Sequence, residues 1–104
     1  MLSIFLLAQM TIGSIALKPA DYLDGRVIAG GTGAPVVMLT LTEATVLRIK
    51  AAGPQSMVTV DGKPVEARVA EPTVEIDGQP SFEAAAKLAL TLTGKPPLPD
   101  SLEE

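Results

Sequence analysis

The amino-acid sequence predicts an α+β fold, with an antiparallel sheet of about four to five strands and two helices packed on one face. Three observations predict it. An Asp61-Gly62 pair separates two segments of alternating apolar and polar residues, which is the pattern of a tight β-hairpin. Two other segments begin with a hydroxyl side chain suited to cap a helix and end at a glycine. Runs rich in β-branched residues, typical of strands, accompany them.

The N-terminal segment is apolar and carries no charged side chain before Lys18. Residues 1–10 resemble the apolar part of a signal peptide whose basic start is missing, so we predict a truncated leader there and a first strand over residues 11–17. Two alternatives stay open. One is a short membrane span, although a span needs roughly 20 apolar residues. The other is an N-terminal strand of a cytoplasmic protein.

The rest of the chain is predicted to be a single α+β domain over residues 11–99, followed by an acidic tail over residues 100–104. Asp21 can cap a single helical turn, and residues 27–29 are an apolar run typical of a short strand. The glycine-rich residues 30–33 are predicted to be a hairpin turn. A phosphate-binding loop is disfavoured there, because the Lys-Ser/Thr pair that completes that motif is missing.

Residues 36–52 predict a strand followed by a helix. The strand has one apolar face, formed by Val37, Leu39 and Leu41. Thr42 is a suitable N-cap and Gly53 a suitable C-terminal residue, so the helix is predicted to run to about Ala52. Its apolar side chains form two stripes, either of which can face the core: Val46 with Ile49, and Ala44 with Leu47 and Ala51.

The Asp61-Gly62 turn sets the register of the central hairpin. A two-residue type I′ turn makes Val60 and Lys63 the closing pair. Residues 63–70 are then the third strand, which is predicted to be an edge because Pro64 has no N–H for a neighbouring strand. Its inner face and that of its partner strand consist of Val58, Val60, Val65, Ala67 and Val69; the outer side chains are Met57, Glu66 and Arg68.

The last third of the chain predicts one more extended segment and a helix. Residues 73–77 either continue the third strand or form a further strand that folds back and covers its edge. Ser81 is predicted to cap the last helix, which runs to about Thr93 and ends at Gly94. The predicted apolar face of this helix consists of Phe82, Ala85, Ala86, Ala89 and Leu92.

With these elements in order, three stretches resemble one family. Residues 21–26, Asp-Tyr-Leu-Asp-Gly-Arg, are similar to its Asp-Leu-x-x-Ala-x motif. Residues 57–65, Met-Val-Thr-Val-Asp-Gly-Lys-Pro-Val, are similar to its Val-Leu-Asp-Gly-Lys-Val-Val hairpin. Residues 81–99 are similar to its last helix, Phe-Thr-x-Glu-Glu-Ala-x-x-Leu-Ala-x-x-Leu-Arg-x-Gly-x-Leu-Pro. Residues 21–99 thus resemble the head subdomain of the first periplasmic region of SecD, a membrane protein of protein export.

This resemblance implies the fold, an exported periplasmic location after signal removal, and binding of unfolded or partner polypeptide, with the Sec export machinery as a possible partner. The chain departs from the family in one important respect. SecD proteins carry several membrane helices and act with SecF, whereas no apolar stretch after Leu17 is long enough to span a membrane. We therefore expect an accessory of export that does not drive export by itself.

The composition excludes several function classes. A net charge of -4 and scattered Lys and Arg residues argue against nucleic-acid binding. Without Cys or His, the chain has no thiol nucleophile, no imidazole base and no common zinc ligand, so no metal, cofactor or catalytic residue is expected. An alternative is a small hydrolase that uses a carboxylate pair, either Asp21 with Asp24 or Glu75 with Asp77. Another is a structural domain of the cell envelope.

The favoured prediction is a non-catalytic module that binds polypeptide along the third strand. An extended segment can pair with an open strand edge through backbone hydrogen bonds. The candidate partner-binding residues are Met57, Lys63, Glu66 and Arg68. Met57, together with Met38, offers a flexible side chain that adapts to varied partners. The competing prediction is that residues 73–77 cover this edge.

Overall fold

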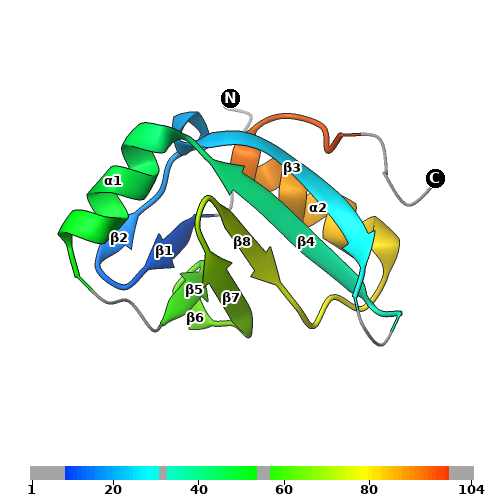
Figure 1. Cartoon of the computed structure of the whole chain (residues 1–104). Helices are drawn as coiled ribbons and strands as arrows, with labels where there is room; N and C mark the ends of the chain where they lie inside the picture. The colour runs from blue at the N-terminus through cyan, green and yellow to red at the C-terminus, as the bar shows by residue number, and fades with distance from the viewer. Residues whose placement is uncertain (1–8, 31–32, 54–56, 99–104) are drawn as a thin grey trace, which may run out of the picture.

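The computed structural model describes residues 9–30, 33–53 and 57–98, and over these ranges it confirms the predicted α+β class. The described strands form two antiparallel four-stranded sheets (Figure 1). The elements in chain order are β1 (Met10–Ile12), β2 (Ile15–Ala16), the 3-10 turn η1 (Pro19–Asp21), β3 (Tyr22–Ala29), β4 (Pro35–Leu41), α1 (Glu43–Ala51), β5 (Val58–Val60), β6 (Lys63–Pro64), β7 (Ala67–Ala70), β8 (Thr73–Ile76) and α2 (Phe82–Thr93).

The first sheet has the strand order β2-β1-β5-β6 and begins with a hairpin. The single strand predicted over residues 11–17 is wrong, because Gly13, with a φ of 61°, turns the chain and pairs Thr11 with Ala16. The predicted leader also ends too late: Met10 pairs with Val60 and is fully buried. Residues 1–8 lie outside the described ranges.

The hairpin between β5 and β6 has the predicted register. Asp61 and Gly62 have φ angles of 54° and 82°, as a type I′ turn requires, and Val60 pairs with Lys63. The Val65 N–H donates to the Val58 carbonyl at 3.0 Å, which carries the pairing one step beyond β6. Local turn chemistry therefore specifies this part of the fold.

The predicted third strand, residues 63–70, is divided between the two sheets. Its first part, β6, pairs with β5, and its second part, β7, pairs with β8 in a sheet of order β3-β4-β8-β7. The segment is thus one of the covalent links between the sheets, besides those from β2 to β3 and from β4 to β5. Strand β3 is also longer than the predicted residues 27–29, since it begins at Tyr22 and has an irregular register before Asp24.

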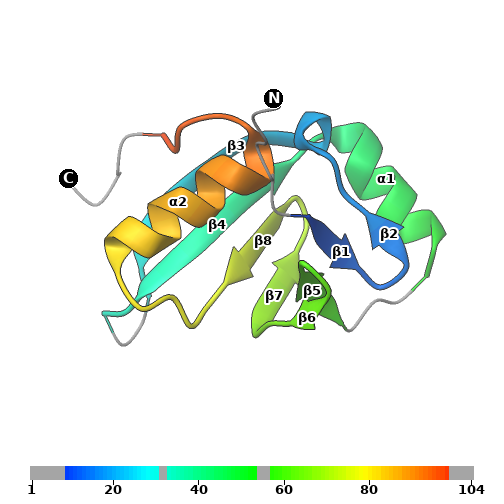
Figure 2. The same ribbon diagram turned by 180° about the vertical axis from the view of Figure 1, so that it is seen from behind.

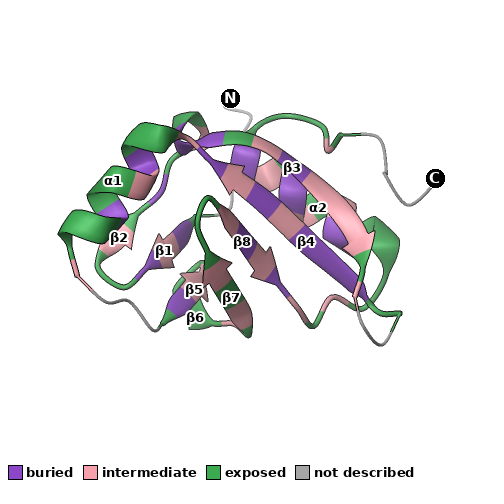
Figure 3. Ribbon diagram, in the orientation of Figure 1, coloured by how far each residue is buried: buried purple, intermediate pink, exposed green. Residues whose placement is uncertain are grey.

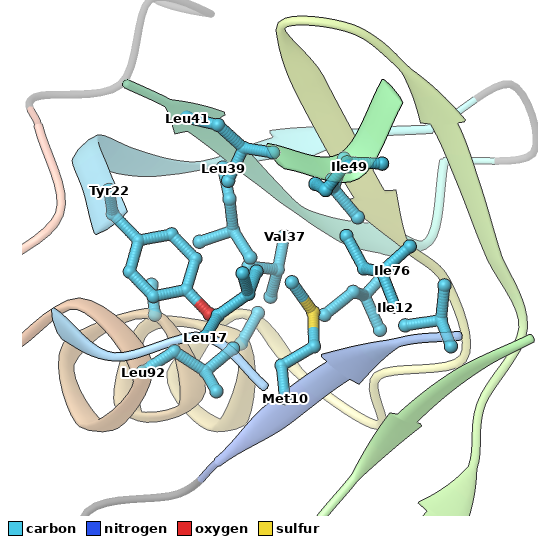
Figure 4. Packing of buried hydrophobic residues seen from close by; sticks show 14 residues of the cluster. Met10, Ile12, Leu17, Tyr22, Val37, Leu39, Leu41, Ile49, Ile76 and Leu92 are labelled. Atoms are coloured by element: carbon cyan, nitrogen blue, oxygen red, sulfur yellow. The ribbon is translucent and has the colours of Figure 1, made fainter. Parts of the chain in front are cut away.

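Both helices bury apolar side chains in one shared core (Figures 2 and 4). Helix α2 crosses β3 at Gly25, where a Cβ atom would lie only 3.2 Å from the Leu39 side chain. In α1 the stripe of Val46 and Ile49 faces inward, and Leu47 is exposed. The core residues are Met10, Ile12, Leu17, Tyr22, Val37, Leu39, Leu41, Ile49, Val58, Val74, Ile76, Ala85, Ala89 and Leu92.

The predicted helix ends are confirmed. The hydroxyls of Thr42 and Ser81 accept hydrogen bonds from backbone N–H groups in the first turns of α1 and α2, and Gly94 ends α2 with a left-handed φ of 75°. The apolar face predicted for α2 is wrong at Phe82, the first residue of the helix, which is 47% exposed. Neither described helix is long and apolar enough to cross a membrane.

Candidate functional site

Strand β7 has one paired side and one open side. The Asp77 N–H donates to the Glu66 carbonyl at 2.9 Å, and Arg68 pairs with Glu75. Since hydrogen-bonded positions alternate along an antiparallel ladder, Arg68 and Ala70 direct their backbone groups toward β8. The N–H and C=O groups of Ala67 and Val69 therefore point the other way. No hydrogen bond joins them to any other residue of the described ranges.

We call these backbone groups of Ala67 and Val69 the open β7 edge. The expectation that residues 63–70 form an open edge on the side away from β5 is wrong, because Thr73–Ile76 folds back and pairs along that side, as the competing prediction states. Among the described residues nothing pairs with the opposite side, because the ladder with β5 ends where the Val65 N–H donates to the Val58 carbonyl. Residues 54–56, which precede β5, lie outside the described ranges. Figures 1 and 2 show β7 beside the hairpin formed by β5 and β6.

Three of the four predicted partner-binding residues share one face beside this edge. Met57, Glu66 and Arg68 are exposed, and the alternation of side chains places them on the outer face, away from the core (Figure 3). Lys63 is also exposed, but it lies next to the turn at the far end of β6 and on the opposite face. Lys63 is therefore separated from the other three.

Arg68 binds two carboxylates of the neighbouring strand region. Its guanidinium bonds to Glu75 across the β7–β8 pair and to Asp77 at 3.0 Å. The bond to Glu75 and the charges of both carboxylates raise the pKa of Arg68, so it stays protonated. These side chains are largely in water, where such ion pairs stabilise the fold little. The sequence pattern gave no signal for this cluster, since it depends on the register between β7 and β8.

The surface around the open β7 edge is acidic. Four carboxylates, those of Glu66, Glu71, Glu75 and Asp77, accompany one guanidinium, that of Arg68, so the local net charge is 1 − 4 = −3. Directly after Ala70, the turn between β7 and β8 and helix α1 border a hollow of about 420 Å³. Its walls include Leu23, Val46, Lys50, Glu71 and Pro72.

Asp21 of the predicted carboxylate pair lies in a cluster of hydrogen bonds, whereas one buried carboxylate oxygen of Asp24 has no hydrogen-bond partner in the described part of the chain. Asp21 accepts hydrogen bonds from the Lys18 N–H at 2.8 Å, from the Thr45 hydroxyl at 3.0 Å and from Arg48 at 3.0 Å. Burial alone would raise the pKa of Asp21, but these hydrogen bonds and the charge of Arg48 outweigh it and hold the pKa below its usual value. Asp21 therefore joins η1 to α1 as an ionised acceptor.

Tyr22 is a buried polar residue that the sequence did not single out. Its ring lies in the core near Leu17 and Leu92 (Figure 4), and its hydroxyl has no hydrogen-bond partner in the described part of the chain. Burial, followed by the charge of Asp21, raises the pKa of Tyr22 above its ordinary range. The hydroxyl therefore stays protonated. Residues 9–30, 33–53 and 57–98 contain no group of three Asp or Glu residues placed to hold a metal ion.

Comparison of the chain with family models, with curated proteins and with solved structures found no match. The functional conclusion below accordingly draws on the open β7 edge and on the residues around it.

Proposed function

We propose that this chain is a non-catalytic module that binds an extended polypeptide segment along the open β7 edge. The observation that carries the proposal is the backbone of Ala67 and Val69, which has no partner among the described residues, in a strand whose other side is paired with β8. Their two N–H and two C=O groups can accept a further strand, which is a recurrent mode of peptide recognition. Paired strands on the β8 side hold these groups in the extended geometry before the partner arrives.

The backbone bonds alone give modest affinity. Each contributes about 0.5–1.5 kcal/mol net, and association itself costs several kcal/mol. Side-chain contacts must therefore supply much of the binding free energy. The local charge of −3 favours segments with Lys or Arg, and β-branched residues favour the extended conformation that pairing requires. We infer a preference for extended segments that combine β-branched and basic residues, with binding that weakens as salt rises.

The resemblance of residues 21–99 to the head subdomain of SecD supports the same conclusion. It adds two parts to the proposal: a periplasmic location, and a role as an accessory that contacts polypeptide during export. The carboxylate-hydrolase alternative finds no support in the geometry, because Asp21 is held by three donors and Glu75 and Asp77 both bind Arg68. A structural envelope domain remains the alternative if no polypeptide binds.

The proposal predicts saturable binding of a fluorescently labelled seven-residue peptide of alternating valine, threonine and lysine, measured by anisotropy at low salt. Ala67→Pro removes an N–H that the fold itself does not use. We expect it to weaken binding by about tenfold or more, which corresponds to about 1.4 kcal/mol.

Ala29→Pro is the matched control, because the Ala29 N–H also points away from its neighbouring strand, at the distant edge strand β3. This variant should bind the peptide like the wild type. Equal affinity of the wild type and Ala67→Pro would contradict the proposed site. Absence of binding at millimolar peptide would contradict the proposed function.

A further inference from the structure

Strand β3 is the other edge of the second sheet, and the described residues cover only its first half. The segment after α2 runs along that half: the Leu98 N–H donates to the Gly25 carbonyl at 2.8 Å, and the Lys95 ammonium donates to the carbonyls of Tyr22 and Leu23 at 3.2 Å each. This segment hydrogen-bonds to no residue of β3 beyond Gly25 in the part that the structure describes.

The second half of β3 presents unpaired backbone groups. The Gly30 N–H donates to the Ala34 carbonyl at 2.8 Å, and Ile28 pairs with Val36. By the alternation of the antiparallel ladder, Ile28 hydrogen-bonds toward β4, whereas Val27 and Ala29 point outward. None of the outward groups has a hydrogen-bond partner among the residues described. We call these groups of Val27 and Ala29 the open β3 edge.

The two open edges differ in how they are protected against pairing with a copy of themselves. Natural edge strands avoid self-pairing by means of charges and prolines. The strand segment of β6 and β7 carries Pro64, Glu66 and Arg68. Residues 27–29 are Val, Ile and Ala, with neither a charge nor a proline, and all three are at least partly exposed. An uncharged apolar edge of this kind can pair with a second copy without repulsion.

We infer that the open β3 edge is a self-association surface, on which a second copy of this chain pairs antiparallel about a twofold axis at Ile28. In this register Val27 faces Ala29 of the second copy, and the two reciprocal pairs form four backbone hydrogen bonds. The two Ile28 side chains meet at the axis, at a position where side chains approach closely. Arg26 faces Gly30, so no like charges oppose each other. The second sheet of one copy and the second sheet of the other thereby join into one continuous sheet.

The cover on the first half of β3 selects this register. Moving the axis by one residue, to Val27, would require Gly25 to pair with Ala29 of the second copy. The Gly25 carbonyl is already bonded to the Leu98 N–H. With the axis at Ile28, the only hydrogen-bonding residues needed are Val27 and Ala29. The surface is distinct from the open β7 edge, which lies at the opposite side of the sheet.

The test is a charge exchange at the axis, followed by sedimentation equilibrium from micromolar to millimolar protein. The wild type should rise from the mass of a monomer to that of a dimer. Ile28→Lys and Ile28→Glu should each stay monomeric, because like charges then meet at the axis. Their equimolar mixture should form the dimer again. A wild type that stays monomeric at millimolar concentration, or an Ile28→Lys variant that associates like the wild type, would overturn the inference.

Two further variants separate this inference from the proposed function and from loss of folding. Ala29→Pro removes one outward N–H of β3 without removing a bond of the fold, so it should abolish self-association and still bind the peptide. Ala67→Pro should still self-associate, but it should bind the peptide more weakly than the wild type. If Ala29→Pro, with the circular dichroism spectrum of the folded protein, dimerises like the wild type, the open β3 edge is not the interface.

Discussion

Leu92→Asp is expected to leave the chain unfolded at room temperature. Leu92 is 1% exposed and lies between α2 and the second sheet, in the same core as Tyr22 and Leu39. The substitution removes apolar burial and places a carboxylate in an apolar core, which together cost about 5 kcal/mol or more. A domain of this size is stable by about 5–15 kcal/mol, and this one has an aliphatic core with few aromatic residues.

The matched control is Leu90→Asp, two residues earlier on the same helix. Leu90 is 43% exposed, so its carboxylate can remain in water and the change should shift the melting temperature by only a few degrees. Thermal unfolding followed by circular dichroism compares the two. Equal melting temperatures for the two variants would show that α2 does not pack on the sheet through Leu92.

Asp21→Ala is expected to lower the free energy of unfolding by about 2–4 kcal/mol, because it removes the shared acceptor of three donors. The side chain of Asp21 is only 12% exposed, so the Lys18 N–H and the Thr45 hydroxyl lose a partner in a place that water reaches poorly. Urea unfolding at pH 7 measures the change.

Arg48→Met separates the ion pair from the other two bonds. The Arg48 side chain is 48% exposed, so its pair with Asp21 should contribute about 1 kcal/mol or less. The account predicts that Asp21→Ala costs clearly more than Arg48→Met. If the two variants lose the same stability, the bonds to Lys18 and Thr45 add nothing and the role assigned to Asp21 is incorrect.

The pH dependence of stability gives an independent check on Asp21. Its pKa is lower in the folded protein than in the unfolded chain, where a carboxyl of this type titrates near about 3.9. The stabilisation is therefore fully present above that pH and is lost as the pH falls toward the folded pKa. Asp21→Asn should lose less stability than the wild type between pH 5 and the acid limit of folding.

Local chemistry explains which elements the sequence predicts well. The Asp61-Gly62 turn requires two positive φ angles, and Ser81 and Gly94 bound α2 through their own hydrogen bonds and dihedral angles. Each of these signals involves residues close together in the chain, so no knowledge of the tertiary fold is needed. The hairpin register and the ends of both helices follow from them.

The division into two sheets depends on contacts between distant residues. Residues 63–70 have one continuous strand pattern. They pair with β5 only as far as Val65, and they pair with β8 only from Glu66 onward. Period-two alternation cannot show on which side of a strand its partner lies. Alternation does show which side chains share a face, so Met57, Glu66 and Arg68 could be assigned to one face. The side on which β8 pairs, and with it the bonds from Arg68 to Glu75 and Asp77, could not be predicted.

The contacts of the buried polar residues could also be predicted only in part, because some of them join residues far apart in the chain. Asp21 reads as a cap for one local turn, and it does accept the Lys18 N–H. Its bonds to Thr45 and Arg48 join residues 24 and 27 positions apart, which no short motif encodes. The burial of Tyr22 likewise depends on the length of β3, whose first residues the sequence assigns to a turn.

Amide hydrogen exchange along β7 tests the central claim, an open edge that accepts a polypeptide, most directly. In the protein alone, the N–H groups of Arg68 and Ala70 should exchange slowly because they bond to β8, and those of Ala67 and Val69 should exchange fast. Saturation with the valine, threonine and lysine peptide should slow Ala67 and Val69 specifically. Uniform protection of all four amides without the peptide, or no change at Ala67 and Val69 on saturation, would contradict it.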